Sequence, residues 1–400
     1  MSWTTSSLTG SPVRPGVSVQ QPFSVGTCTG WVSDESGAWN VVVDGTTVDD
    51  GLEHAGPVWG PGQRTWCTDD GGRTVAYTRN EAGFGSLWVL NRASGARTMV
   101  GRAVHGCVSW SGSTLAAVRT GARTPSQLVA YDMSDLFAPR RVLTVDTAPD
   151  SWSAFDADLV EPTVHAAGDV PYRLYRAARP NGRLIVWVHG GPVDQWQVTW
   201  RPRFTFWLSR GYSIAVPDHR GTTGHGRAFR LALEGGWGAV DADDTALVAR
   251  HAQGLLGTDA SRTALMGGSA GGLSVLSAAA RHASLAACAV VSYPVTDLGL
   301  LLATPDPFEG HYNGRLVGDP AVSPAVSPGR LVDVPVLSFH GDLDELVVPA
   351  HSLGLRDAVT AAGGSVRVEM MAGEGHGFRD PANIAREYAL TEAFLGEHLA

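Results

Sequence analysis

Apolar residues in the C-terminal part of the chain form short continuous runs that end in glycine or polar residues. Such runs of strand length are typical of parallel strands buried on both faces. Stretches with helical character separate them, and this alternation predicts a doubly wound, mostly parallel sheet of the α/β-hydrolase type over residues 161–400. The apolar runs that predict strands, together with the glycine or polar residues that end them, span residues 183–191, 213–221, 263–272, 286–294, 335–342 and 366–373. The predicted helices cover residues 243–256, 272–283, 353–363 and 383–399.

The N-terminal part has shorter apolar runs that Gly, Asp, Ser and Asn separate, as in a β-rich domain. Its pattern repeats about every forty residues, and Cys28, Cys67 and Cys107 follow the same spacing. A period near forty with several short strands is typical of β-propeller blades. We therefore predict an N-terminal tail over residues 1–19 and an all-β, truncated propeller-like domain over residues 20–160. The domain has room for three repeats, or four if residues 151–160 contribute, and we interpret the three cysteines as core packing positions.

Composition narrows the chemistry. All 30 cationic side chains among the 400 residues are arginine and none is lysine. This excludes a lysine Schiff base, a Ser-Lys dyad and a P-loop lysine. The formal net charge of −9 and the absence of a basic stripe argue against a nucleic acid partner.

The chain shows no sign of secretion or membrane insertion. The first residues lack the apolar core of a signal peptide, and no apolar run reaches the length of a membrane span. The four scattered cysteines are typical of reduced thiols, so we expect a cytoplasmic protein. No histidine pair has metal-ligand spacing, and we expect neither a metal nor a cofactor. The sequence leaves the oligomeric state open, and a homo-oligomer is one of the options.

The strongest local motif is Gly267-Gly268-Ser269-Ala270-Gly271, between a predicted strand and a predicted helix. This is the context of a nucleophile elbow, in which glycines allow a sharp turn that exposes the serine hydroxyl. A serine needs a base to become a nucleophile. His376 follows the last predicted strand, and Asp342 and Asp344 follow the strand before it. We predict a triad of Ser269, Asp344 and His376, with Asp342 as the less favoured acid.

An acyl-transfer enzyme also needs two N–H groups that face the developing oxyanion. We expect one from Ala270, which follows the nucleophile. The other comes from the His189-Gly190-Gly191-Pro192 loop, where Gly191 is the first candidate and Gly190 the second. We interpret His189 as a structural residue.

Residues from about 165 onwards resemble the catalytic domain of the prolyl oligopeptidase family of serine peptidases, and most of all its acylaminoacyl-peptidase and dipeptidyl-peptidase-like branch. The matching stretches run through the domain in order: VHGGP, PDHRGTTGHGRAFRLALEGGWGAVDADD, MGGSAGG, DPFEGHYNGRLVG, SFHGDLDELVVPAHS and GEGHGFR. The resemblance implies the same triad and an N-terminal propeller. It implies a short peptide or an N-acylated amino acid as the substrate.

Among the departures from the family pattern, two bear on the substrate. The family's propeller has about twice the residues available here, so a closed funnel is not expected. The N-terminal half lacks a paired-Glu motif that would anchor a free amino terminus, which does not favour dipeptidyl peptidase activity.

The residues around the predicted site have two interpretations each. Trp196, Trp200 and Phe308 either line an acyl pocket or pack in the domain, and Glu309 either binds a substrate amine or forms a salt bridge. We interpret Arg220 as a buried structural ion-pair partner rather than a substrate clamp. Two rival functions also stay open: an esterase, thioesterase or acyl-transferring cyclase acting on a small molecule with the same triad, and a non-catalytic binding protein.

Overall fold

The computed structural model describes residues 17–25, 28–48, 51–59, 63–304 and 309–400. The chain divides into two compact units. The first unit comprises Met1–Thr120, Ser126–Thr147 and Gly224–Arg227, and the second comprises Gly121–Pro125, Ala148–Thr223 and Ala228–Ala400. The domain limits expected from the sequence, residues 20–160 and 161–400, stay a prediction.

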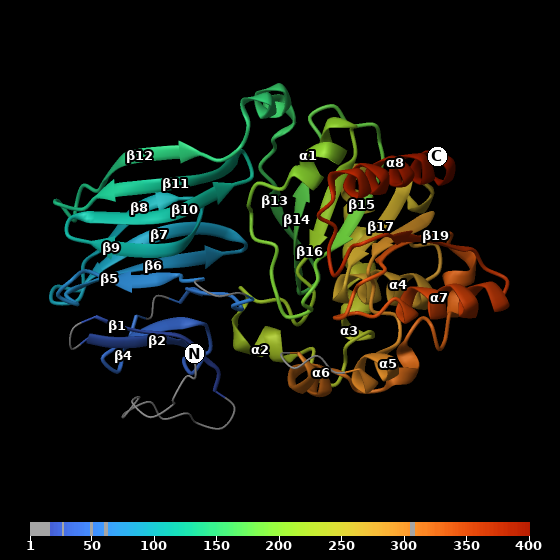
Figure 1. The fold of residues 1–400 in the computed structure, drawn as a ribbon, viewed down its shortest axis with the longest axis horizontal. Helices are drawn as coiled ribbons and strands as arrows, with labels where there is room; N and C mark the ends of the chain where they lie inside the picture. Colours follow the sequence, from blue (N-terminus) through green and yellow to red (C-terminus); the bar gives the residue numbers. More distant parts are fainter. Residues whose placement is uncertain (1–16, 26–27, 49–50, 60–62, 305–308) are drawn as a thin grey trace. The chain divides into compact units, whose positions relative to one another are not determined.

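The described part of the first unit contains three antiparallel sheets of four strands each, in blue to teal in Figure 1. Each sheet is built from strands that follow one another in the chain, as the repeat of about forty residues predicts. The first sheet contains β1 (Val19–Val25), β2 (Cys28–Ser33), β3 (Asn40–Val43) and β4 (Thr46–Thr47). The second contains β5 (Trp66–Thr68), β6 (Thr74–Glu81), β7 (Phe84–Asn91) and β8 (Arg97–Arg102). The third contains β9 (Val104–Ser111), β10 (Thr114–Gly121), β11 (Thr124–Asp132) and β12 (Arg140–Asp146).

Two details of this unit differ from the sequence prediction. Residues 151–160 do not add a strand, because Asp150–Asp158 forms a 3₁₀ helix, η1, in the second unit. Its backbone bonds are local, as in the hydrogen bond from Trp152 N to Pro149 O. Cys28 and Cys67 are buried as expected, but Cys107 is exposed. The pairing of β9 with β10 shifts register beside Cys107, whose φ of 52° marks a bulge, and the extra residue turns its side chain to the outer face.

The second unit contains an eight-stranded sheet in the order β13-β14-β16-β15-β17-β18-β19-β20. The pairs from β16 to β20 are parallel, and the hairpin of β13 and β14 joins antiparallel at one edge. The sequence prediction missed this hairpin. The strands are β13 (Thr163–Ala167), β14 (Val170–Tyr175), β15 (Leu184–Val188), β16 (Ser213–Pro217), β17 (Thr263–Gly268), β18 (Cys288–Ser292), β19 (Val336–Gly341) and β20 (Val366–Met371).

Helices cover both faces of this sheet, so its central strands are buried (Figure 1). On one face, α3, α4 and α7 share a hydrophobic core with the strands, and on the other face α1 and α8 do so. The fold prediction of an N-terminal all-β domain and a C-terminal α/β-hydrolase domain is confirmed. The helices are α1 (Pro202–Ser209), α2 (Gly226–Leu231), α3 (Val240–Leu256), α4 (Ala270–Arg281), α5 (Leu298–Ala303), α6 (Gly310–Leu316), α7 (Ala350–Ala361) and α8 (Pro381–His398), with short 3₁₀ helices η2 (Ala260–Arg262), η3 (Pro320–Val322) and η4 (Gly329–Asp333).

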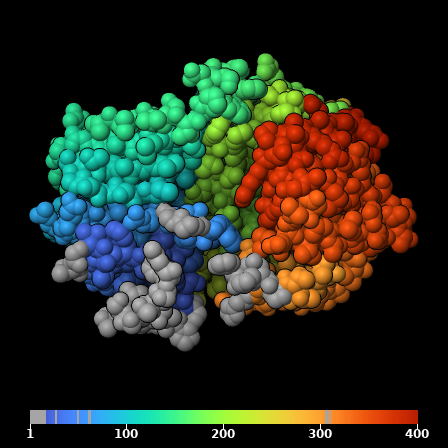
Figure 2. Space-filling model, in the orientation of Figure 1, coloured from blue at the N-terminus to red at the C-terminus, as the bar shows by residue number. Residues whose placement is uncertain are grey.

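Helix α8 ends the chain and forms part of the surface of the second unit, in red in Figure 2. No helix in the described ranges combines the length and the apolar character that crossing a membrane requires.

Candidate active site

Ser269 lies at the sharp turn between β17 and α4 with φ 55° and ψ −126°. A positive φ is uncommon for a residue with a side chain and indicates a turn that its surroundings hold in place. The flanking glycines make the turn feasible. A methyl group at Gly267 would overlap the carbonyl oxygen of Gly271, and one at Gly271 would overlap the carbonyl oxygen of Val188. The sequence motif therefore forms the elbow that its spacing predicts.

Backbone hydrogen bonds hold the elbow on both sides. Ser269 N–H donates to Ser292 O at 3.1 Å, and Ser269 O accepts from Val295 N–H at 3.1 Å. Ala270 begins α4, and the N–H groups of a first helical turn have no partner inside the helix. The positive end of the helix dipole therefore lies directly behind the serine.

The His189–Pro192 loop follows β15 and lies beside the elbow. A methyl group at Gly190 would lie 3.5 Å from the Cβ atom of Ser269 and 3.3 Å from Gly268 O. Gly191 has φ +123°, a conformation that favours glycine. Both oxyanion candidates, Gly191 and Ala270, thus belong to segments that meet at Ser269.

His189 holds the first peptide group of this loop. Its side chain is fully buried, and burial is the main cause that lowers its pKa to about 3. The ring is therefore neutral at pH 7. Because a carbonyl oxygen only accepts, His189 Nδ1–H donates to Gly190 O at 2.8 Å, and Nε2 accepts from the Thr222 hydroxyl at 2.8 Å. The structural interpretation of His189 agrees with these contacts.

Tyr312 of α6 holds the next part of the loop. Its hydroxyl donates to Gly191 O at 2.7 Å and accepts from Val193 N–H at 3.1 Å. Burial raises the pKa of this phenol, which keeps its proton available for the donated bond. Sequence reasoning did not single out Tyr312, although it lies in a stretch that carries the family resemblance.

Asp344 and His376 meet at the ends of β19 and β20. His376 Nδ1 lies 2.8 Å from Asp344 Oδ2, and the side chain of Asp344 is completely buried. The other carboxylate oxygen accepts from the N–H groups of Leu346 and Val347, each at 3.0 Å. Asp342 instead accepts from Gly373 N–H at 2.7 Å in an exposed position. Of the two candidate acids, Asp344 is the one that contacts the histidine.

Tyr293 lies close to both the histidine and the elbow, and sequence reasoning missed it. Its ring centroid is 4.6 Å from that of His376, and a methyl group at Gly268 would lie 3.4 Å from the same tyrosine ring. The hydrogen bonds of the described residues do not include one between the Ser269 hydroxyl and His376. The pairing of these two side chains therefore belongs to the proposal below.

The other predicted binding residues have different surroundings. Trp196 is half-buried and packs edge-on against Trp187, at a centroid distance of 5.9 Å. Trp200 packs against Trp152 of η1 at 4.8 Å, which agrees with domain packing. Phe308 lies outside the described residues. Glu309 precedes α6, and its backbone carbonyl accepts from Asn313 N–H.

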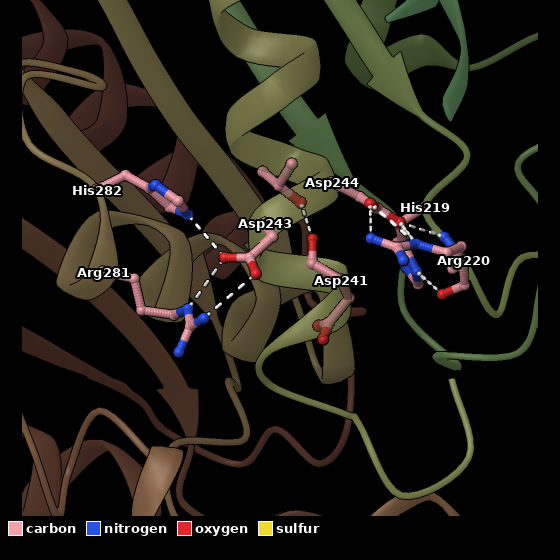
Figure 3. Close-up of polar contacts among 8 residues, drawn as sticks. His219, Arg220, Asp241, Asp243, Asp244, Arg281 and His282 are labelled. Carbon is pink, nitrogen blue, oxygen red and sulfur yellow. Dashed lines mark hydrogen bonds and ion pairs between the residues drawn. The ribbon is translucent and has the colours of Figure 1, made fainter. Parts of the chain in front are cut away.

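Arg220 forms the ion pair that the sequence interpretation expects, but the expectation that its side chain is buried is wrong. Its guanidinium lies against Asp244 of α3, with a nitrogen-to-oxygen distance of 2.5 Å (Figure 3). The aspartate side chain is buried, whereas the Arg220 side chain is 44% exposed, so only the acidic partner belongs to the core.

Comparisons with known proteins point to one family. A model of the prolyl oligopeptidase family matches residues 196–400. Dipeptidyl aminopeptidase BIII of Pseudoxanthomonas mexicana is 30% identical over 231 residues, which cover 54% of this chain and 33% of that protein. Acylamino-acid-releasing enzyme 1 of Oryza sativa subsp. japonica is 33% identical over 132 residues, or 32% of this chain and 16% of that protein.

Solved structures extend the likeness over nearly the whole chain. A puromycin-hydrolyzing peptidase of Mycobacterium tuberculosis superposes with a TM-score of 0.85 at 23% identity, covering 96% of this chain and 62% of that one. A puromycin hydrolase gives a TM-score of 0.84 at 25% identity, with 96% and 62% covered. The chain thus spans about a third of the length of the first relative and under two thirds of these structures. With a family model matched over half of its residues, the chain belongs to the prolyl oligopeptidase family.

Proposed function

We propose that the protein is a serine hydrolase that works through an acyl-enzyme, with Ser269 as nucleophile, His376 as base and Asp344 as the orienting acid. The observation that carries the proposal is the hydrogen bond between His376 and the buried Asp344, beside a strained nucleophile elbow. Because His376 Nδ1–H donates to Asp344, the Nε2 lone pair is left to accept the Ser269 proton. Asp344 also stabilises the imidazolium that forms.

The two N–H groups of Ala270 and Gly191 stabilise the oxyanion in this proposal. Ala270 N–H belongs to the first turn of α4, directly after the elbow residue Ser269. In a peptide unit the carbonyl and the following N–H point in opposite directions. The hydrogen bond from His189 to Gly190 O therefore fixes the direction of the Gly191 N–H. His376 then returns the proton to the leaving group, and water releases the acyl group.

The proposed substrates are short peptides or N-acylated amino acids. The support comes from the family and from relatives named as a dipeptidyl aminopeptidase and an acylamino-acid-releasing enzyme. The same triad would also suit an esterase, a thioesterase or an acyl-transferring cyclase.

A fluorophosphonate probe tests the mechanism directly. We expect the folded wild-type protein to carry one phosphonyl adduct at Ser269, identified by peptide mass spectrometry, and Ser269→Ala to carry none. Ser277→Ala is the control, because Ser277 is a buried serine inside α4 and its substitution should leave labelling unchanged. A folded protein with an unlabelled Ser269 would refute the hydrolase and favour the binding-protein alternative.

A substrate panel separates the two hydrolase candidates. Aminoacyl peptides, N-acylated amino acid amides and p-nitrophenyl esters are compared by kcat/KM. Turnover of the amide substrates supports a peptidase. Ester turnover without amide turnover, in a protein that the probe labels, contradicts it and supports an esterase.

We also propose a cytoplasmic location. All four cysteines carry free thiols, which agrees with a reducing compartment. Fractionation of the native host cell, with an antibody against this chain, tests the location.

A further inference from the structure

The second unit contains a cavity of about 200 Å³ beside the proposed active site. It lies between the sheet and the two helices on one face, α1 and α8. Two other cavities in the described residues have volumes of about 10 Å³, which suits at most a water molecule. The large cavity is lined by Trp187, Trp196, Arg203, Trp207, Met266, Gly267, Gly268, Val290, Ser292, Tyr293, Glu387, Tyr388 and Thr391.

Five of its thirteen lining residues are aromatic. Three tryptophans contribute from β15, from the loop after it and from α1, and two tyrosines contribute from the end of β18 and from α8. Aromatic rings with a few fixed polar groups are the usual lining of small-molecule sites. A dry cavity of about 150 Å³ in another protein is large enough for benzene. This cavity therefore has room for a ring with a small substituent.

The two charges in the lining neutralise each other. Arg203 of α1 and Glu387 of α8 form a two-pronged pair, with nitrogen-to-oxygen distances of 3.1 and 2.9 Å. The Ser292 hydroxyl donates a further bond of 2.8 Å to Glu387. Glu387 is almost fully buried, whereas 38% of the Arg203 side chain is exposed. The outer N–H groups of Arg203 can therefore donate to a polar group on a ligand, while a net charge on the ligand would lack a counter-ion.

The cavity shares residues with the catalytic centre. Gly267 and Gly268 lead directly into Ser269, and Tyr293 packs against His376. Ser292, another lining residue, accepts the Ser269 N–H through its carbonyl oxygen. An occupant would therefore contact the groups that position the proposed nucleophile and base.

We propose that this cavity binds an uncharged aromatic ring that carries one hydrogen-bond acceptor. The ring belongs either to a substrate or to a free aromatic molecule. The chemistry of recognition is the same in both cases: aromatic packing plus a hydrogen bond from Arg203. Binding is a property of the folded second unit and is measured without turnover, so its outcome is independent of the proposed hydrolase mechanism.

Three probes of similar size and different charge test the ligand class. p-Cresol, benzylamine and benzoate are titrated against the full chain at pH 7 and followed by ligand-observed NMR. We expect p-cresol to bind at least tenfold more tightly than either charged probe. Equal or tighter binding of benzylamine or benzoate, or no binding of p-cresol, would overturn the proposal.

Substitutions in α8 test the location. Thr391 is buried and lines the cavity, so Thr391→Met fills part of it, and p-cresol affinity should fall at least tenfold. Ala393→Met is the matched control, because it enlarges an exposed residue of the same helix and should leave affinity within twofold. If Thr391→Met does not fold, Trp196→Ala removes a half-buried wall residue and should weaken binding similarly. Unchanged affinity in the folded cavity variants refutes the site.

Two further measurements distinguish the source of the ring. If the ring belongs to a substrate, Thr391→Met should lower the preference for aromatic over alanine substrates, and phosphonylation of Ser269 with a bulky aromatic probe should block p-cresol. If the ring belongs to a free molecule, the preference stays unchanged, and p-cresol still binds after phosphonylation with the same bulky aromatic probe. Absence of p-cresol binding to a protein that the probe labels refutes the cavity alone, whereas binding to an unlabelled protein refutes the hydrolase alone.

Discussion

The Tyr312 hydroxyl donates a hydrogen bond to Gly191 O and accepts one from Val193 N–H, so one phenol bridges two sides of the loop that follows β15. This contact joins residues more than a hundred positions apart in the chain, on α6 and at the end of a central strand. It places Tyr312 as a positioning residue for the proposed oxyanion site, since it restrains the loop that carries the Gly191 N–H.

Tyr312→Phe should therefore lower kcat more than it raises KM. The loss of about one hydrogen bond that positions the loop corresponds to about a tenfold decrease in kcat. The measurement is steady-state kinetics on the best substrate of the panel. Tyr212→Phe is the control, because Tyr212 is also a buried tyrosine and its hydroxyl accepts from Arg183 instead. A Tyr312→Phe variant with unchanged kcat and a lower melting temperature would indicate a purely structural contact.

Asp344→Asn should decrease kcat/KM by about 10⁴-fold, while Asp342→Asn should leave it within about twofold. An asparagine amide at position 344 would donate to His376 Nδ1 and leave the histidine proton on Nε2. A protonated Nε2 cannot accept the Ser269 proton. The Asp342 side chain accepts a hydrogen bond from Gly373 N–H, and its backbone N–H donates to Met371 O. The test is the pair of kcat/KM values, and an equal loss in both variants would contradict the choice of acid.

The buried His105 should make the first unit less stable as the pH falls. Burial is the main cause that lowers its pKa from 6.5 to about 4, and its ring nitrogens contact Ala103 O and the Tyr131 hydroxyl. Between pH 6.5 and about 4, the unfolded chain therefore binds a proton that the folded chain does not. The contribution of neutral His105 to the free energy of unfolding is fully present above pH 6.5. It is lost as the pH falls to about 4, at up to about 1.4 kcal/mol per pH unit.

Urea unfolding at pH 8, 6 and 5 measures this effect. Glutamine does not titrate, so the His105→Gln variant should lack this proton uptake on unfolding. The difference in unfolding free energy between wild type and variant should therefore shrink as the pH falls. At pH 8 both side chains are neutral, which supplies the baseline. Parallel pH dependences in the two proteins would show that His105 does not titrate in this way.

Cys107 should be the one fast-reacting thiol. It is exposed, whereas burial raises the pKa of Cys67 and Cys288 to about 12 and also raises the pKa of Cys28. The thiolate is the reactive form, so a chromogenic disulfide at pH 8 should modify one thiol quickly and the other three only after denaturation. Cys107→Ser should abolish the fast phase, and a remaining fast phase would contradict the outward turn at the β9 bulge.

Local patterns predicted much of this fold because they reflect local physics. Continuous apolar runs become buried strands, and the glycines around Ser269 are required by the contacts of the elbow itself. The chain order of Ser269, Asp344 and His376 was readable because each residue follows a predicted strand. The hairpin of β13 and β14 was missed, since a short edge hairpin lacks the continuous apolar run of the central strands.

The repeat of the first unit shows where local patterns fail. Cys28, Cys67 and Cys107 have nearly the same spacing, but only the first two are buried. A bulge inserts one residue into the pairing of β9, and side chains alternate between faces along a strand. One extra residue therefore moves a side chain to the opposite face of the sheet. The face of Cys107 thus depends on how β9 pairs with its partner strand and not on the spacing of the cysteines.

The sequence by itself determined the order of the central strands and of the four long helices between and after them, the elbow at Ser269 and the absence of any lysine-based route to an activated serine. Tertiary structure alone decided which carboxylate contacts His376, which side chains hold the Gly191 loop, and that Arg203 and Glu387 pair across an aromatic cavity. The reason is that these contacts join residues separated by 32 to 184 positions, on different strands and helices. Their partners follow from how the sheet and its helices pack, which no local spacing encodes.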